Sequence, residues 1–127
     1  DMDTSKILGA EHIGIPCKDI EETIAFYERL GFKLYWRSPS GNNVAFLTLG
    51  DMVIETYESA SIVGTNGAVD HIAMRVRDIE SLYKQAVEEG CEIVTDGLVT
   101  LPFLENGVKF FKFYGPNREI LELLERL

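Results

Sequence analysis

The sequence predicts an α+β fold built from two tandem copies of one βαβββ unit. Three observations lead to this prediction: an internal repeat, a strand and helix that open each copy, and three further strand-like segments that close it. The segment EHIGIPCKDIEETIAFYERLGF, from Glu11, aligns without a gap with DHIAMRVRDIESLYKQAVEEGC, from Asp70, at an offset of 59 residues. A repeat that stays in register over such a length indicates a duplicated structural unit, and it superposes His12 on His71.

Each copy opens with a strand followed by a helix. Residues 10–16 alternate in polarity, which places His12 and Gly14 on one face of the predicted strand. Asp19 and Asp78 stand where the N-cap of the next helix belongs, and only the first copy has the glutamate that completes a capping box. A glycine follows each helix as a stop signal, at positions Gly31 and Gly90. Apolar residues at helical spacing predict buried helix faces formed by Ile20, Ile24 and Tyr27 in the first copy and by Ile79, Leu82, Tyr83, Ala86 and Val87 in the second.

Three strand-like segments follow each helix. They read FKLYWRS, NVAFLTLG and DMVIETYE in the first copy, and CEIVTD, VKFFKFYG and REILELLE in the second. SPSGNN and LGDM are predicted to form hairpin turns. The spacing from Glu55 to Glu122 is 67 residues, eight more than the repeat offset, so an insertion is expected at residues 96–107. Both a lid over a pocket and a plain surface loop are compatible with such an insertion.

The chain of 127 residues suits a single domain. Within it we expect a first module at residues 8–57, a linker at residues 58–67 and a second module at residues 68–125. The net charge of −9 disfavours nucleic acid and anionic membranes as partners. The sequence contains no apolar run of membrane-spanning length and no signal-peptide core. Its two cysteines do not make a disulfide framework, so a cytoplasmic location is expected.

Four residues are candidates for a divalent metal site. The two histidines of the chain, His12 and His71, occupy equivalent positions in the two copies. Glu55 and Glu122 each lie in the apolar closing strand of a copy, where an ionised carboxylate needs either a cation or a solvent-facing position. If both pairs face inward, two imidazoles and two carboxylates form a ligand set that suits a transition metal and leaves room for substrate oxygens.

Other residues have weaker indications. Arg75 and Lys112 are compatible with binding an anionic substrate group or with reaching into solvent. Four aromatic residues at strand spacing are expected in the core rather than in a pocket wall, namely Trp36, Phe46, Phe111 and Phe113. Cys17 and Cys91 are interpreted as small buried hydrophobes, not nucleophiles.

The opening segment, extended to EHIGIPCKDIEETIAFYERLGFKL, resembles that of glyoxalase I and its relatives in the vicinal oxygen chelate (glyoxalase/bleomycin resistance/dioxygenase) superfamily. MVIETYE resembles the closing strand of the first copy in that enzyme, and GPNREILELLE resembles its last strand. The resemblance spans about residues 8–125. It implies a glyoxalase-like fold in which two modules form an open, partly closed β-barrel-like sheet.

The resemblance also implies a site and a reaction. Carried over by position, it makes His12, Glu55, His71 and Glu122 the ligands of a divalent metal, either Ni, Co or Zn. It implies an isomerase or lyase that converts a hemithioacetal of a 2-oxoaldehyde through an enediolate. Glu122 would be the catalytic base and Glu55 its partner on the opposite face. A homodimer is expected, with the site either shared between subunits or formed within one chain.

The sequence departs from that family pattern at three positions. Pro16 replaces an arginine that anchors glutathione, Ser59 replaces an expected asparagine, and Arg118 replaces the usual glycine of the last turn. A lactoylglutathione lyase-like activity on a small-molecule substrate is therefore expected with the thiol carrier left open. The alternatives are a CoA-thioester epimerase or another enzyme on the same scaffold, and a metal-free protein that binds a small molecule such as a drug.

Overall fold

The computed structural model describes residues 3–6, 8–39, 41 and 43–127. Along these residues the order βαβββ occurs twice, which confirms the predicted α+β fold class. After a short 3-10 helix, η1 (Thr4–Lys6), the first run consists of β1 (Ile13–Cys17), α1 (Ile20–Arg29), β2 (Lys33–Arg37), β3 (Val44–Leu49) and β4 (Met52–Glu58). The second run consists of β5 (Ile72–Arg75), α2 (Ile79–Glu88), β6 (Val99–Leu101), β7 (Val108–Tyr114) and β8 (Ile120–Arg126). The chain separates into two compact units, Asp1–Ile62 and Val63–Leu127, here called the first and second modules.

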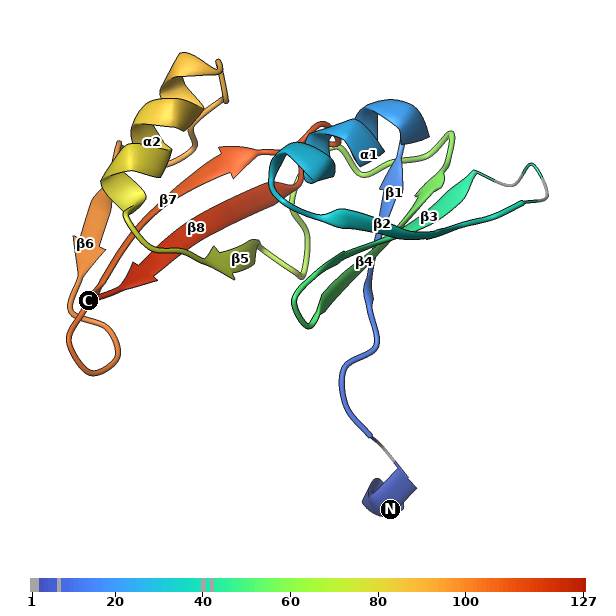
Figure 1. The fold of residues 1–127 in the computed structure, drawn as a ribbon, viewed down its shortest axis with the longest axis horizontal. Helices are drawn as coiled ribbons and strands as arrows, with labels where there is room; N and C mark the ends of the chain where they lie inside the picture. The colour runs from blue at the N-terminus through green and yellow to red at the C-terminus, as the bar shows by residue number, and fades with distance from the viewer. Residues whose placement is uncertain (1–2, 7, 40, 42) are drawn as a thin grey trace. The chain divides into compact units, whose positions relative to one another are not determined.

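Each module contains an open four-stranded sheet with one helix on one of its faces (Figure 1). The strand order is β1-β4-β3-β2 in the first module and β5-β8-β7-β6 in the second. The opening and closing strands pair in parallel, and the remaining neighbours are antiparallel. The register repeats as well, because Gly14 lies opposite Glu55 and Ala73 lies opposite Glu122. The duplication seen in the sequence is therefore also a duplication of strand pairing.

The core of the first module lies between α1 and its sheet. Asp19 caps the helix as predicted, accepting a hydrogen bond from the backbone N–H of Glu22 at 3.0 Å. The predicted helix face is buried, with Thr23 added to it. Beneath the helix, the sheet contributes side chains with no exposed surface, which are Ala45, Leu47, Ile54 and Thr56. Because strand side chains alternate between faces, the residues between them point to the opposite face and remain available for binding.

The core of the second module is built mainly on β7 and β8. Phe111, Phe113 and Leu121 are almost completely buried, as predicted for the two phenylalanines. On α2 only Ile79 is fully buried, and Val87 is half-exposed, so its predicted place in the buried face is wrong. The helix α2 packs chiefly on β7 and β8, whereas α1 packs on three strands. The sheet therefore covers the last turn of α2 less completely.

A glutamate at the end of each closing strand caps the helix of its own module. Glu58 accepts a hydrogen bond from the Ile20 N–H, and Glu125 accepts one from the Ile79 N–H, both at 3.0 Å. These glutamates are repeat-related, and each holds a carboxylate at the positive end of a helix dipole. Asp78 occupies the N-cap position of α2 in a left-handed conformation, φ 54°, and its side chain makes no cap hydrogen bond, contrary to the prediction.

The edge of the second sheet differs from its predicted form. Residues 91–96 do not form a regular strand, and only Ile93 makes a bridge, to Phe113. The chain then leaves the sheet in a turn in which Thr95 donates to the Gly97 carbonyl, and it returns as β6. The eight extra residues thus form a loop and a longer hairpin with β7. The hairpin forms because Val-Thr-Leu, the sequence of β6, is a second strand-forming segment.

The two predicted hairpin turns have different outcomes. LGDM connects β3 to β4 as expected, with Gly50 at φ 57°. The SPSGNN turn includes Ser40 and Asn42, which lie outside the described residues.

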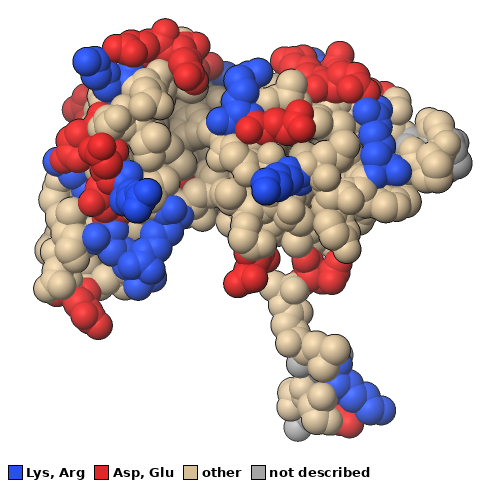
Figure 2. Space-filling model, viewed as in Figure 1, with Lys and Arg blue, Asp and Glu red and all other residues tan. Residues whose placement is uncertain are grey.

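Acidic side chains account for much of the surface charge on the helices. Figure 2 shows Asp and Glu side chains gathered over α1 and α2, with lysines and arginines among them. The described part of the chain contains no helix long and apolar enough to cross a membrane.

Candidate functional site

Each module brings one histidine next to one glutamate. His12 and His71 directly precede β1 and β5, so the predicted opening strand begins one residue after its histidine. His12 Nε2 lies 3.5 Å from Glu55 Oε1, and His71 Nε2 lies 3.8 Å from Glu122 Oε1. These are the two pairs expected from the repeat, and the parallel register of the opening and closing strands produces both of them.

The other ring nitrogen of each histidine faces the acidic residue that precedes it. His71 Nδ1 lies 2.8 Å from Asp70 Oδ2, and His12 Nδ1 lies 3.6 Å from Glu11 Oε1. Asp70 also accepts a hydrogen bond from Asn66 at 2.6 Å. These hydrogen bonds, first that from His71 and then that from Asn66, hold the pKa of Asp70 below its ordinary value.

This arrangement decides which ring nitrogen is available for a ligand. An ionised carboxylate only accepts hydrogen bonds, so the proton of a neutral His71 ring is on Nδ1, facing Asp70. The lone pair is then on Nε2, which faces Glu122. Metal-binding histidines in proteins are commonly oriented in this way by a carboxylate behind the ring.

The two glutamates differ in burial. The side chain of Glu122 is 7% exposed, compared with 27% for Glu55. Among the described residues, the His71 ring is the one ionic or hydrogen-bonding neighbour found for the Glu122 carboxylate. Burial of an ionised carboxylate has a general cost that a nearby cation offsets. A cation beside Glu122 would remove that cost.

The donor types of the two pairs, imidazole and carboxylate, suit a divalent metal. Two ligands that each lie about 2.1 Å from one ion stand about 3.0–3.4 Å apart. The nitrogen-to-oxygen distances of 3.5 and 3.8 Å are slightly wider than this. Within the residues described, no three or more His, Cys, Asp or Glu side chains form one group that would hold an ion. The structure therefore brings the four predicted ligands together as two pairs, and their joint role in one site remains a prediction.

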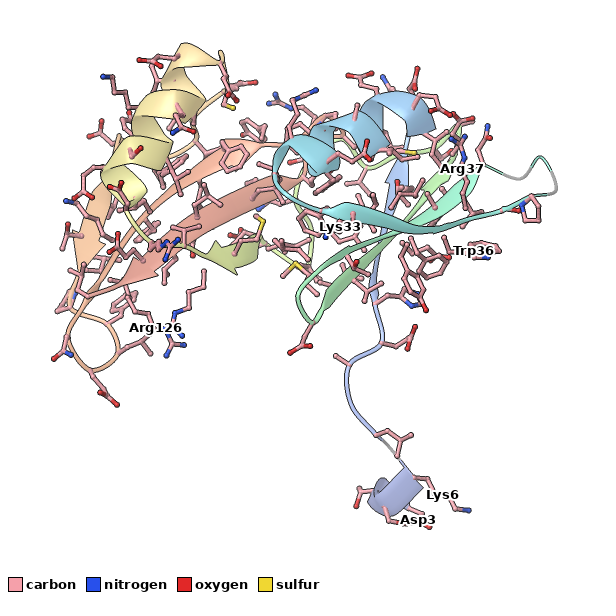
Figure 3. All side chains as sticks on the ribbon, viewed as in Figure 1. Asp3, Lys6, Lys33, Trp36, Arg37 and Arg126 are labelled. Atoms are coloured by element: carbon pink, nitrogen blue, oxygen red, sulfur yellow. The ribbon has the colours of Figure 1, made fainter. Side chains whose placement is uncertain are left out.

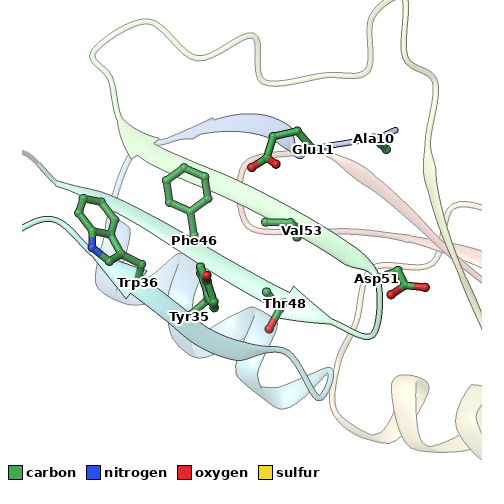
Figure 4. Close-up of a pocket in the computed structure, with 8 residues that line it drawn as sticks. All are labelled: Ala10, Glu11, Tyr35, Trp36, Phe46, Thr48, Asp51 and Val53. Carbon is green, nitrogen blue, oxygen red and sulfur yellow. The ribbon is translucent and has the colours of Figure 1, made fainter. Parts of the chain in front are cut away.

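A pocket adjoins the His12–Glu55 pair on the face of the first sheet opposite α1. Its volume is about 650 Å³, and Figure 4 shows its lining residues, which are Ala10, Glu11, Tyr35, Trp36, Phe46, Thr48, Asp51 and Val53. Phe46 connects the pocket to the pair, because its ring meets the His12 ring edge-on at a centroid distance of 5.4 Å. Phe46 also contacts Trp36 edge-to-face at 6.0 Å. We name this cavity the aromatic pocket.

The expectation that Trp36 and Phe46 belong to the core is wrong. Trp36 is 47% exposed and points away from α1, whereas its neighbour Arg37 points toward the helix and pairs with Glu21 (Figure 3). The pairing of β2 with β3 shifts between Leu34 and Trp36. Such a β-bulge turns successive residues toward one side, which explains why Tyr35 and Trp36 both line the pocket.

A second hollow, of about 410 Å³, lies in the second module. It is bordered by Arg75, Arg126 and the loop from Leu104 to Gly107, together with Leu127. Arg75 thus faces a concavity, and Lys112, the other basic candidate, lies 3.8 Å from Asp70. Of the two cysteines, Cys17 is fully buried as expected, whereas Cys91 is half-buried, and neither forms a disulfide bond.

Several residues around these hollows were not found from the sequence. Tyr35 and Asp51 in the first module and Arg126 in the second carry no repeat or motif signal. The position of Tyr35 on the pocket wall depends on a β-bulge that the sequence pattern does not predict. Asp51 has the sequence features of an ordinary turn residue. Only the charge match between Glu11 and Asp70 pointed to the carboxylates behind the histidines.

Comparisons with known proteins agree with this architecture. The family model described as Glyoxalase/Bleomycin resistance protein/Dioxygenase superfamily matches residues 9–99. The uncharacterized protein YwbC of Bacillus subtilis (strain 168) is 34% identical over 126 residues, covering 91% of this chain and 96% of that protein. A glyoxalase family protein from Bacillus cereus has a TM-score of 0.79 at 18% identity, with 100% of this chain and 99% of that chain covered. The fosfomycin resistance protein FosX from Listeria monocytogenes has a TM-score of 0.74 at 19% identity, with 94% of each chain covered. The two structural likenesses show a shared fold, and the family match establishes that the chain belongs to the glyoxalase/bleomycin resistance protein/dioxygenase superfamily.

Proposed function

We propose that this protein is a metal-dependent isomerase or lyase of the glyoxalase I type, which converts a hemithioacetal of a 2-oxoaldehyde through an enediolate. The observation that carries the proposal is the repeated His–Glu pair, with an acidic residue behind each ring. A structural histidine has no need for such an arrangement, and its occurrence in both modules is what a divided ligand set requires. The ligands of the metal are then His12, Glu55, His71 and Glu122.

The bound cation would supply Lewis acidity, polarising the substrate oxygens and acidifying the neighbouring C–H. The two imidazoles and two carboxylates fit Ni, Co or Zn. Asp70 and Glu11 keep the histidine rings oriented, with Nε2 toward the glutamate of the same module. Thus the first task of this chain's residues is to present four donors in a defined orientation.

The second task is proton transfer. We assign the base role to Glu122, whose carboxylate would take the proton from one substrate carbon and return it to the adjacent carbon. Its burial supports this assignment, because a proton held there exchanges slowly with water and goes back to the substrate. Glu55, which is more exposed, would be the partner on the opposite face.

The setting of the enzyme belongs to the same proposal. We propose a homodimer acting on a small-molecule substrate in the cytoplasm. The absence of a disulfide bond between Cys17 and Cys91, both within the described residues, is compatible with a reducing compartment. A CoA-thioester epimerase or another enzyme on this scaffold would use the same two pairs and differ in the substrate pocket.

A second candidate function is metal-free binding of a small molecule, as in a resistance protein. The aromatic pocket favours it, because about 650 Å³ is a volume typical of ligand-binding cavities. One solved structure of similar fold is named a fosfomycin resistance protein. The two candidates differ in whether the His–Glu pairs are needed for function.

Elemental analysis of protein purified without added metal tests the proposal. We expect bound Ni, Co or Zn in the wild type and a sharp loss of metal in His71→Ala. Lys84→Ala, an exposed truncation on α2 of the same module, should retain the wild-type metal content. Unchanged metal content in His71→Ala, or a wild-type protein that takes up no metal on reconstitution, would contradict the enzyme proposal and favour the binding protein.

A further inference from the structure

We propose that the aromatic pocket of the first module recognises a small organic cation with a flat ring, such as an aryl ammonium compound. Identifying this compound class as the substrate rests on the proposed function, since the pocket adjoins the His12–Glu55 pair through Phe46. The binding itself rests only on the pocket.

The aromatic side chains provide the surface for a flat ring. Tyr35 is 74% exposed and Trp36 is 47% exposed, which is unusual for large aromatic residues on a sheet face. The bulge in β2 places both on the wall of one cavity, and Phe46 closes the wall on the side of His12. Aromatic faces of this kind attract both planar ligands and cations, the latter through the ring quadrupole.

The charges of the pocket have one sign. Glu11 and Asp51 contribute carboxylates, and none of the described residues that line the cavity is a lysine or arginine. Figure 4 shows Asp51 at the turn between β3 and β4 and Glu11 on the segment that precedes β1. No ion pair of Asp51 is found in the described part of the chain, so its carboxylate is available to a ligand. Two carboxylates without a cation repel anions and favour a positively charged group.

The basic concavity of the second module makes the contrast clear. There, Arg75 and Arg126 line the wall together with Glu105, so the charged lining residues carry a net positive charge. The charged residues that line the two hollows therefore differ in the sign of their net charge. The first module is specialised for the opposite charge.

Nuclear magnetic resonance tests the inference directly, because Trp36 is the one tryptophan in the sequence and gives a single indole N–H signal. Three probes separate ring from charge: benzyltrimethylammonium, phenylmethanesulfonate of opposite charge, and tetramethylammonium without the ring. The full chain is titrated as purified and again after removal of metal with a chelator. We expect benzyltrimethylammonium to shift the indole signal to saturation and to bind at least about fivefold more tightly than either other probe.

Two variants test the residues. Asp51→Asn should weaken benzyltrimethylammonium binding about two- to fivefold, the size expected for an exposed charge interaction. Asp96→Asn, the same change at an exposed position of the other module, should leave binding unchanged. Trp36→Leu should weaken binding more than Asp51→Asn, measured by calorimetry because the indole is lost.

The outcomes against the inference are equally specific. Equal or tighter binding of phenylmethanesulfonate, an unchanged affinity in Asp51→Asn, or no indole shift with any probe up to roughly 10 mM would overturn it. The measurement on metal-free protein separates this result from the proposed function. If the pocket binds the cation in a protein that cannot bind metal, the inference about the pocket is supported and the proposed metalloenzyme function is contradicted.

Discussion

At the scale of single residues, Glu55 and Glu122 show how two equivalent positions acquire different properties. Each lies opposite a small residue at the equivalent position of the opening strand, Gly14 or Ala73, and faces the histidine of its module. Glu122 is nevertheless buried, whereas more than a quarter of Glu55 remains exposed. The repeat alone predicts equal carboxylates, and burial distinguishes the proposed base from its partner.

The substitution Glu122→Gln should abolish turnover while leaving the fold intact. The amide keeps the shape of the side chain but cannot take a proton, and a general base of this kind is worth about 100- to 10,000-fold in rate. Steady-state kinetics with metal-loaded protein measures the effect, and circular dichroism checks the fold. Near-normal activity would remove Glu122 from the base role. Glu55→Gln is the matched variant for the second carboxylate.

In the proposed metal site Asp70 would be a positioning residue, because its contact is with the His71 ring. Asp70→Asn should lower metal affinity about 10- to 100-fold, the usual effect of losing the carboxylate behind a ligand histidine. Glu11→Gln should have a smaller effect, since Glu11 lies 3.6 Å from its ring and Asp70 only 2.8 Å from its own.

Competition with a chromophoric chelator measures these affinities, with Asp96→Asn as the control. Thermal unfolding of the metal-free proteins provides the readout that separates positioning from stability. If Asp70→Asn lowers the melting temperature of metal-free protein but leaves metal affinity unchanged, Asp70 has only a structural role.

At the scale of secondary-structure elements, the two helices begin differently despite their common origin. α1 has two acceptors at its N-terminus, Asp19 from its own N-cap and Glu58 from β4. α2 has the corresponding glutamate, Glu125, whereas Asp78 makes no side-chain cap. The start of α2 therefore lacks the N-cap hydrogen bond that supplements the strand glutamate in α1.

Removal of these glutamates should reveal the difference. We expect Glu125→Ala to lower the free energy of unfolding by about 1–2 kcal/mol, the typical cost of a lost helix cap. Glu58→Ala should cost less, because Asp19 continues to hold the first turn of α1. Urea unfolding followed by circular dichroism compares the two variants. A larger loss for Glu58→Ala would show that the strand-to-helix bonds do not act as caps.

In the turn before β8, Arg118 stands where the family pattern has a glycine, and neighbouring side chains contact it. Arg118 adopts φ 66°, a conformation in which glycine is the usual residue. Its guanidinium stacks 3.8 Å from the centroid of the Tyr114 ring and pairs with Glu92 at 2.7 Å. These contacts explain how a long side chain takes the place of the glycine expected there.

At the scale of the whole molecule, the departures from the glyoxalase I pattern and the charge of the aromatic pocket point in one direction. Compared with the glyoxalase I pattern, Pro16 replaces the arginine expected to anchor glutathione, and Ser59 replaces an expected asparagine. Glu11 and Asp51 add negative charge where a glutathione conjugate, itself anionic, would have to approach. Both observations argue for a thiol carrier other than glutathione.

The hemithioacetal of glutathione and methylglyoxal should accordingly be a poor substrate for metal-loaded protein. We expect its kcat/KM to be at least about tenfold below that of the hemithioacetal formed from cysteamine, whose ammonium group suits the pocket, a difference of about 1.4 kcal/mol in transition-state binding. Product formation followed by chromatography compares the two under equal metal loading. Rapid conversion of the glutathione adduct would show that Pro16 and Ser59 are not specificity determinants.

The sequence by itself determined the features that depend on local order along the chain. The in-register repeat predicted the two βαβββ modules and the equivalence of His12 with His71, because duplicated patterns fold into duplicated units. It also identified Glu55 and Glu122 as the partners of these histidines. The single-domain organisation and the role of the four residues in one metal site remain predictions.

Tertiary structure decided what depends on contacts between segments distant in sequence. Pairing of β2 with β3 creates the bulge that turns Tyr35 and Trp36 into one pocket, and the same tertiary packing buries Glu122 more than Glu55. The edge of the second sheet runs through β6 because β7 offers a free pairing side beyond Ile93. Residue patterns report which face a side chain prefers, but the neighbours it meets on that face are set by strand pairing and packing.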